Sequence, residues 1–234
     1  MHIPDGIRGL EQDLRAIFGR RLRSLVVYAS GHGRENLPTP TLAVVDTLGA
    51  DDLRACAARL DDWHDLALAT PLVLAAHELE RSLDAFPYEF GAILAEHVVV
   101  SGVSPFGGLR VDPADLRRAC EARARSHLLH LREGYLETRG RGDGVADLIL
   151  RSSAALTALV RSVARLQGAT TDNVDAAAGH IESVAGLSPG SLKDVVKLSA
   201  GGSLSADEAR RIFPTYLEAV TTLTNEVDRW NAPR

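Results

Sequence analysis

In the first 111 residues, segments whose hydrophobic positions recur with a helical period are interspersed with short, continuous apolar runs. The helical period after Pro4 and Asp5 predicts an amphipathic helix with inward side chains at Ile7, Leu10, Leu14, Ile17 and Phe18. Apolar runs predict four strands, at residues 24–29, 41–46, 66–74 and 97–101. Further helical patterns occupy residues 51–62, 78–83 and 88–95. This alternation predicts a small mixed sheet with helices packed against it.

Two of these segments carry more specific expectations. In the 51–62 helix the side chains expected to point inward are Leu53, Cys56, Ala57 and Leu60. Pro71 interrupts the third strand and suits an edge or a bulge, because proline cannot donate to the ladder. The residues expected on adjacent central strands are Val26, Val44 and Val73.

From Asp112 onward the pattern becomes purely helical. Asp112 as N-cap, with Pro113 and Asp115 in the first turn, predicts a long helix that ends near Glu137. The Gly-rich link 139–144 separates it from further helices at residues 145–166, 172–185, 188–198 and 205–230, the last opening with the capping box Ser205 to Glu208. The leucines expected to be buried between the two longest, antiparallel helices are Leu128, Leu131, Leu156 and Leu159.

The predicted fold class is therefore α+β. A small mixed-sheet domain spans residues 1–111, and an all-α helical bundle spans residues 112–234.

Composition narrows the environment and the partners. The net charge of −5 and the pI of about 5.9 argue against a broad nucleic-acid surface. Cys56 and Cys120 are too few for a disulfide framework or a cysteine zinc site, which favours a reducing cytoplasm. The charged stretch 1–20 does not resemble a signal peptide, and no apolar run approaches the roughly 20 residues of a spanning helix. We expect a cytoplasmic protein without a membrane partner.

The junction of the first two predicted strands carries the most specific motif. The first strand ends in Ala29-Ser30 and a Gly-rich turn, Gly31-His32-Gly33-Arg34, and the second opens with Thr39-Pro40-Thr41. The segment resembles nucleotidyltransferases of the DNA polymerase beta type, in which a strand ends in Gly-Ser and the next opens with Asp-x-Asp.

The two-part layout extends this resemblance over most of the chain. A nucleotidyltransferase head followed by helices is similar to aminoglycoside nucleotidyltransferases, and to minimal nucleotidyltransferases paired with HEPN-like helical domains in bacterial toxin–antitoxin systems. The segments that carry this second likeness are 71–74, 81–90 and 129–136.

The resemblance implies a metal site whose acids are missing here. Nucleotidyl transfer uses two divalent cations held by carboxylates, and Asp-x-Asp aims two of them to one face of a strand. Thr39 and Thr41 keep that spacing but offer only neutral hydroxyls, and the 66–74 strand, which matches the strand of the third acid, contains none. We therefore expect no metal ligands and no cofactor at this site. Mg²⁺ would bind at this site only if other acids served as its ligands, and the candidates are Glu35, Asp46 and Glu78.

The Gly-rich turn supplies the candidate nucleotide contacts. Ser30, Gly31 and Gly33 can present backbone N–H groups to a phosphate, and Arg34 can reach one. A plain Gly-rich turn with an exposed arginine fits the same residues, and His32 fits a solvated turn position.

A second pattern, the Arg-x4–6-His of HEPN ribonucleases, carries no weight. The pairs that fit it are Arg59–His64, Arg123–His130 and Arg125–His130, and the composition predicts about that many by chance. The interpretation favoured by the sequence is a degenerate nucleotidyltransferase-like protein with a non-catalytic binding, regulatory or assembly role, whose partners would be a nucleotide, a second copy or another protein. Two alternatives stay open: an active transferase of a nucleoside monophosphate to a small molecule or protein, and a helical interaction module on a structural base.

Overall fold

The described part of the chain forms two compact units. The computed structural model describes residues 5–28, 37–169, 171 and 173–230. The chain passes from the first unit to the second between Val111 and Asp112. The first unit is mixed and the second is all-helical, so the predicted α+β class is confirmed.

The first unit is built on a four-stranded mixed sheet. Its strands are β1 (Leu22–Tyr28), β2 (Thr41–Val45), β3 (Leu72–Ala75) and β4 (His97–Gly102), in the order β3-β2-β1-β4. β1 runs antiparallel to both β2 and β4, and β2 runs parallel to β3. The predicted pairing of the first two strands is confirmed, since Val26 lies opposite Leu42. Val73 was wrongly expected on a central strand, because β3 is an edge.

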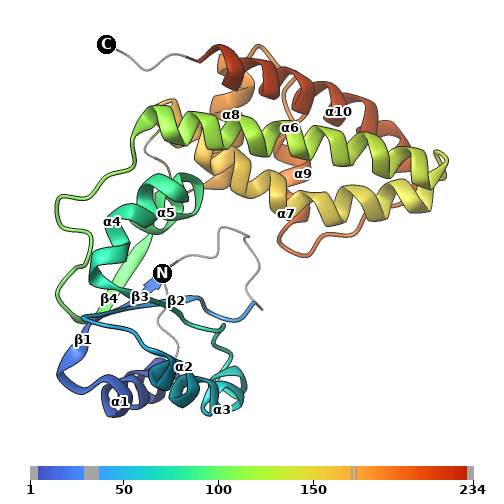
Figure 1. Ribbon diagram of the computed structural model, residues 1–234. Coiled ribbons are helices and arrows are strands. Elements are labelled where there is room, and N and C mark those ends of the chain that lie inside the picture. The colour runs from blue at the N-terminus through green and yellow to red at the C-terminus, as the bar shows by residue number, and fades with distance from the viewer. Residues whose placement is uncertain (1–4, 29–36, 170, 172, 231–234) are drawn as a thin grey trace. The chain divides into compact units, whose positions relative to one another are not determined.

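Helices cover both faces of this sheet (Figure 1). α1 (Ile7–Phe18), α2 (Ala50–Ala57) and α3 (Leu60–Asp65) pack on one face, and α4 (Ala76–Ala85) and α5 (Pro87–Ala95) on the other. Alternate residues of β1 and β2 therefore enter two separate cores. The central strands are buried on both sides, which is why they read as continuous apolar runs rather than as alternating ones.

Two predicted elements of this unit are divided differently in the structure. The single helix expected over 51–62 is wrong: α2 ends at Ala57 and α3 begins at Leu60. Leu53 and Ala57 are exposed. α2 has only about two turns, and Cys56 is the side chain that it buries in the core. The strand expected over 66–74 begins only at Leu72, after Pro71.

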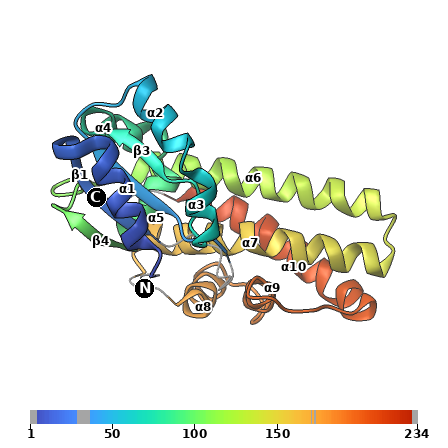
Figure 2. The same cartoon turned by 90° about the horizontal axis from the view of Figure 1, so that it is seen from below.

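The second unit is a bundle of five helices within its described residues. They are α6 (Pro113–Thr138), α7 (Gly142–Leu166), α8 (Val174–Val184), α9 (Lys193–Leu198) and α10 (Ala206–Arg229). Figure 2 shows its long helices from the side. α6, α7 and α10 pack against one another along their length, and α8 and α9 pack against α7. The four leucines predicted between the long helices are buried, as expected.

The helix expected over 188–198 is much shorter in the structure. Residues 189–192 form turns instead, and α9 begins at Lys193. No helix among the described residues is long and apolar enough to cross a membrane.

Candidate functional site

The candidate site lies where the end of β1 meets the start of β2. Val27 pairs with Thr41, so the two strand ends share one edge of the sheet. The predicted nucleotide contacts Ser30, Gly31, Gly33 and Arg34 fall in residues 29–36, outside the described residues, as do His32 and Glu35. The described side of the site is therefore Tyr28 and residues 37–41. The amide N of Tyr28 donates to the carbonyl oxygen of Pro40 at 3.3 Å, and burial raises the pKa of the Tyr28 hydroxyl.

Thr41 occupies the first position of β2 and is completely buried. Strand alternation places its side chain on the same face as Ala43 and Val45, whose core includes α1, α2 and α3. The Thr41 hydroxyl has no hydrogen-bond partner among the described residues. A carboxylate at this position would lose its hydration without gaining a partner from the described chain, which is an unfavourable environment for an ionised group.

Thr39 lies before β2 and is held by its backbone. It forms an isolated parallel bridge with Leu68, in which its amide N donates to the Ala67 carbonyl (2.8 Å) and its carbonyl accepts from the Ala69 amide (2.9 Å). Ala67 has a φ of 57°, a left-handed conformation that is uncommon for a residue with a Cβ. The Thr39 side chain is half-buried. The two threonines therefore keep the spacing of the acids but differ in burial.

Asp46 lies at the opposite end of β2 from Thr41. Five residues of extended strand separate them by roughly 16 Å. The Asp46 carboxylate is ion-paired with the Arg23 guanidinium of β1, and its amide N donates to the Arg21 carbonyl at 2.8 Å. The structure therefore does not bring Asp46 to the candidate site.

Glu78 also lies near the end of the sheet that is remote from Thr41. β3 runs parallel to β2 with Ala75 beside Val45, and α4 follows β3 directly. The Glu78 carboxylate accepts from the Ala75 amide at 2.8 Å and so caps the first turn of α4. Within the described part of the chain, no group of three or more His, Cys, Asp or Glu side chains is arranged to hold a metal ion.

The ion pair between Arg21 and Asp52 in the first unit is structural. Arg21 donates two hydrogen bonds to Asp52, at 2.8 and 2.7 Å, and ties the start of α2 to the turn before β1. The hydrogen bond from Arg21, with another from the Gly49 amide, lowers the pKa of Asp52 to about 2. This carboxylate is a helix cap with a bound arginine and not a free ligand.

The Arg-x4–6-His pairs are not assembled into a common site. Arg59 is ion-paired with Asp13 and Asp62, whereas His64 contacts the Thr70 hydroxyl. In the second unit, Arg125 binds Glu121 and Asp228, and the exposed His130 lies 2.7 Å from the backbone carbonyl of Ser126. The side chains of Arg59–His64 and of Arg125–His130 thus engage different neighbours.

Sequence reasoning missed a hydrogen-bond chain inside the bundle. His127 Nε2 of α6 lies 2.7 Å from the Tyr216 hydroxyl of α10, which lies 3.1 Å from the Ser152 hydroxyl of α7. Burial, with a smaller contribution from His130, lowers the pKa of His127 to about 4. Burial also raises the pKa of Tyr216. The helical spacing of His127 with its neighbours was the available signal, but it did not identify a partner in another helix.

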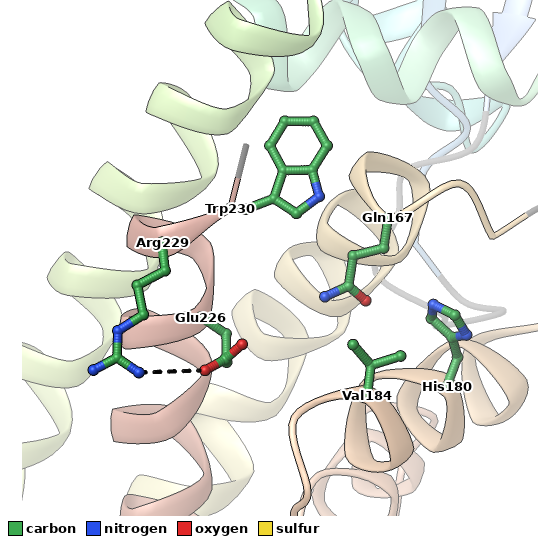
Figure 3. A pocket seen from close by; sticks show the side chains of 6 residues that line it. All are labelled: Gln167, His180, Val184, Glu226, Arg229 and Trp230. Atoms are coloured by element: carbon green, nitrogen blue, oxygen red, sulfur yellow. Dashed lines mark ion pairs between the residues drawn. The ribbon is translucent and has the colours of Figure 1, made fainter. Parts of the chain in front are cut away.

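The second unit also contains a pocket that the sequence did not indicate (Figure 3). Its volume is about 300 Å³, and its lining comes from α8, α10 and the residues that follow α7 and α10. The lining residues are Gln167, His180, Val184, Glu226, Arg229 and Trp230.

Comparison with known proteins shows a likeness in fold. No protein-family model matches the chain, and no curated protein matches it significantly. Among solved structures it is similar to spectinomycin adenyltransferase AAD(9) from Enterococcus faecialis, crystallised with ATP and spectinomycin. The match has a TM-score of 0.56 and 14% sequence identity, and covers 96% of this chain and 99% of that one. The chain therefore has a nucleotidyltransferase-like fold over nearly its whole length.

Proposed function

We propose that this protein is a nucleotidyltransferase-like pseudoenzyme with a binding, regulatory or assembly role. Thr41 carries the proposal. It occupies the position where the resemblance places the second acid of Asp-x-Asp, and its buried hydroxyl has no hydrogen-bond partner in the described chain. A divalent cation needs anionic oxygen ligands, and a neutral hydroxyl in an apolar core does not replace them.

The positions of the remaining acids support the same conclusion. Asp46 and Glu78 lie at the end of the sheet opposite the candidate site, and each carboxylate already has a partner inside the unit. Moving either to the candidate site would break its ion pair or its helix cap.

The rival proposal is an active nucleotidyltransferase that uses non-standard acids. It is favoured by the likeness to an adenyltransferase crystallised with ATP. Of the three acids considered from the sequence, only Glu35 is left for this role, because the structure places the other two away from the site. Such an enzyme would require Mg²⁺ and would lose activity when Glu35 is replaced by Gln.

The deciding experiment is calorimetry of the full chain with ATP, GTP, CTP and UTP, each with and without Mg²⁺. The pseudoenzyme should show no binding that depends on Mg²⁺, and should transfer no labelled nucleoside monophosphate to a small-molecule panel or to itself. Metal-dependent affinity together with turnover that Glu35→Gln abolishes would establish the enzyme instead.

An assembly role requires a partner, and a second copy of the chain is the simplest one. Light scattering over a range of protein concentrations should then show a mass above the 25.1 kDa of one chain. The buried leucines between α6 and α7 are occupied within the bundle and do not form that surface.

A further inference from the structure

Two residues that line the pocket of the helical unit each carry a buried polar atom without a hydrogen-bond partner among the described residues. These atoms are Gln167 Oε1, just after α7, and His180 Nε2, on α8. An unpaired buried acceptor or donor costs about 1–3 kcal/mol. Both residues line the same pocket of about 300 Å³, and a ligand that hydrogen-bonds to the two atoms would remove this cost.

The walls of the pocket are aromatic and apolar. Figure 3 shows Gln167 between the indole of Trp230 and the side chain of Val184. A half-buried indole offers a face on which a planar ring can stack, and Val184 offers an apolar contact on the other side. The volume is at the lower end of the range for small-molecule sites.

The charges near the pocket cancel. Glu226 and Arg229 are one turn apart on α10 and form an ion pair at 3.8 Å, so the carboxylate already has a counter-ion. The unpaired groups are a neutral amide and an imidazole. This combination disfavours a charged ligand and favours one that presents a donor and an acceptor on the edge of a flat ring.

We propose that this pocket binds an uncharged nitrogen heterocycle of the nucleobase type. Its ring stacks on Trp230, and its edge hydrogen-bonds to Gln167 and His180. Both polar atoms are covered in the structure, so binding requires the Gln167 amide and the His180 ring each to turn about the last torsion, whose energy profile is broad for both side chains. The proposal does not depend on the state of the candidate site in the first unit.

Calorimetry of the full chain with adenine, cytosine, uracil and hypoxanthine tests it. These probes carry no phosphate and need no metal, so their binding is independent of the nucleotide tests above. At least one should bind with a dissociation constant below 1 mM, and Gln167→Leu should weaken it at least tenfold. The matched control is Gln12→Leu, on an exposed glutamine of α1, which should leave the affinity unchanged.

Fluorescence provides a second readout. The chain has two tryptophans, and Trp63 is buried in the first unit, so a ligand-induced change in emission should disappear in Trp230→Phe. Three results would overturn the proposal: no base binds at millimolar concentration, bases bind equally well to Gln167→Leu, or only organic cations such as choline and spermidine bind. The first would mean that water fills the pocket.

Discussion

At the scale of single residues, the decisive position is Thr41. A buried hydroxyl without a partner is unfavourable by itself, yet it is far less costly than an unpaired carboxylate at the same place. The residue thus fits a core position at the start of a strand better than it fits a ligand position. Thr39, half-buried and fixed by its backbone, is the more permissive of the two.

The double substitution Thr39→Asp with Thr41→Asp tests whether these threonines stand at the catalytic positions. Without cations it should lower the free energy of unfolding by about 3 kcal/mol or more, because it adds two like charges and buries one of them. Mn²⁺ should recover part of that loss, because the cation binds only the folded state. Thermal melting of both proteins, with and without Mn²⁺, measures the effect.

The single variants divide this effect. Thr41→Asp should account for most of the loss, and Thr39→Asp for little. Because burial raises the pKa of a carboxyl group, the folded Thr41→Asp chain binds its proton more tightly, and the loss should be smaller at pH 4 than at pH 7. Stabilisation of the wild type by Mn²⁺, or none in the double variant, would contradict the assignment of these positions.

At the scale of elements, hydrogen bonds of buried polar side chains fix helix boundaries that the apolar pattern does not define. Glu182 of α8 is the strongest case. Its buried carboxylate accepts hydrogen bonds from the amides of Gly190 (3.1 Å), Leu192 (2.8 Å) and Lys193 (2.9 Å). These contacts hold the turn before α9 and explain why that helix starts late.

Replacing Glu182 with Ala should therefore destabilise the bundle by about 3 kcal/mol, because three buried or half-buried amides lose their acceptor. Glu182→Gln keeps one acceptor oxygen and should cost less. Glu218→Ala, on an exposed position of α10, is the matched control and should stay within about 0.5 kcal/mol. Urea unfolding measures all three; equal costs for Glu182→Ala and the control would show that the turn does not need the carboxylate.

The His127–Tyr216–Ser152 chain should make bundle stability depend on pH. The pKa of His127 is about 4 in the folded chain, against the ordinary 6.5, so the unfolded chain takes up the proton first. This contribution to the free energy of unfolding is complete above pH 6.5 and decreases as the pH falls toward 4. Urea unfolding should show a loss of roughly 2 kcal/mol from this group between pH 6.5 and pH 5.

The control for this prediction is His127→Phe, which removes the titrating group and keeps an aromatic ring. The variant should show a flatter dependence of unfolding free energy on pH over the same interval. If wild type and variant give parallel pH profiles, His127 does not carry the linkage.

At the scale of the whole molecule, each compact unit has its own core and its own tryptophan. Trp63 is buried in the first unit, and Trp230 follows α10 in the second. Leu156→Ala, in the core of the bundle, should lower the free energy of unfolding of the second unit by about 3 kcal/mol. It should therefore lower the temperature of the unfolding transition that Trp230 reports. The transition seen by Trp63 should move little, since the substitution leaves its core intact.

The single-tryptophan variants Trp63→Phe and Trp230→Phe separate the two signals in thermal unfolding followed by fluorescence. Coincident shifts of both transitions in the Leu156→Ala background would mean that the two units unfold as one cooperative body.

Most of the architecture could be predicted because it depends on local periodicity and on helix caps. The strands β1 and β2, the N-cap of α6 at Asp112 and the capping box at Ser205 all appear where their residues indicate. The errors occurred in short segments. The division of 51–62 into two helices, the late start of β3 and the late start of α9 depend on contacts with residues distant in sequence, which no local pattern contains.

The sequence by itself determined the α+β class, the pairing of the first two strands and the absence of Asp-x-Asp, because these follow from side-chain period and residue identity. Only the tertiary structure decided that Thr41 is buried, that Asp46 and Glu78 lie at the opposite edge, and that Gln167 and His180 line one pocket. Burial and proximity are set by which elements pack together, and that packing depends on contacts across the whole chain.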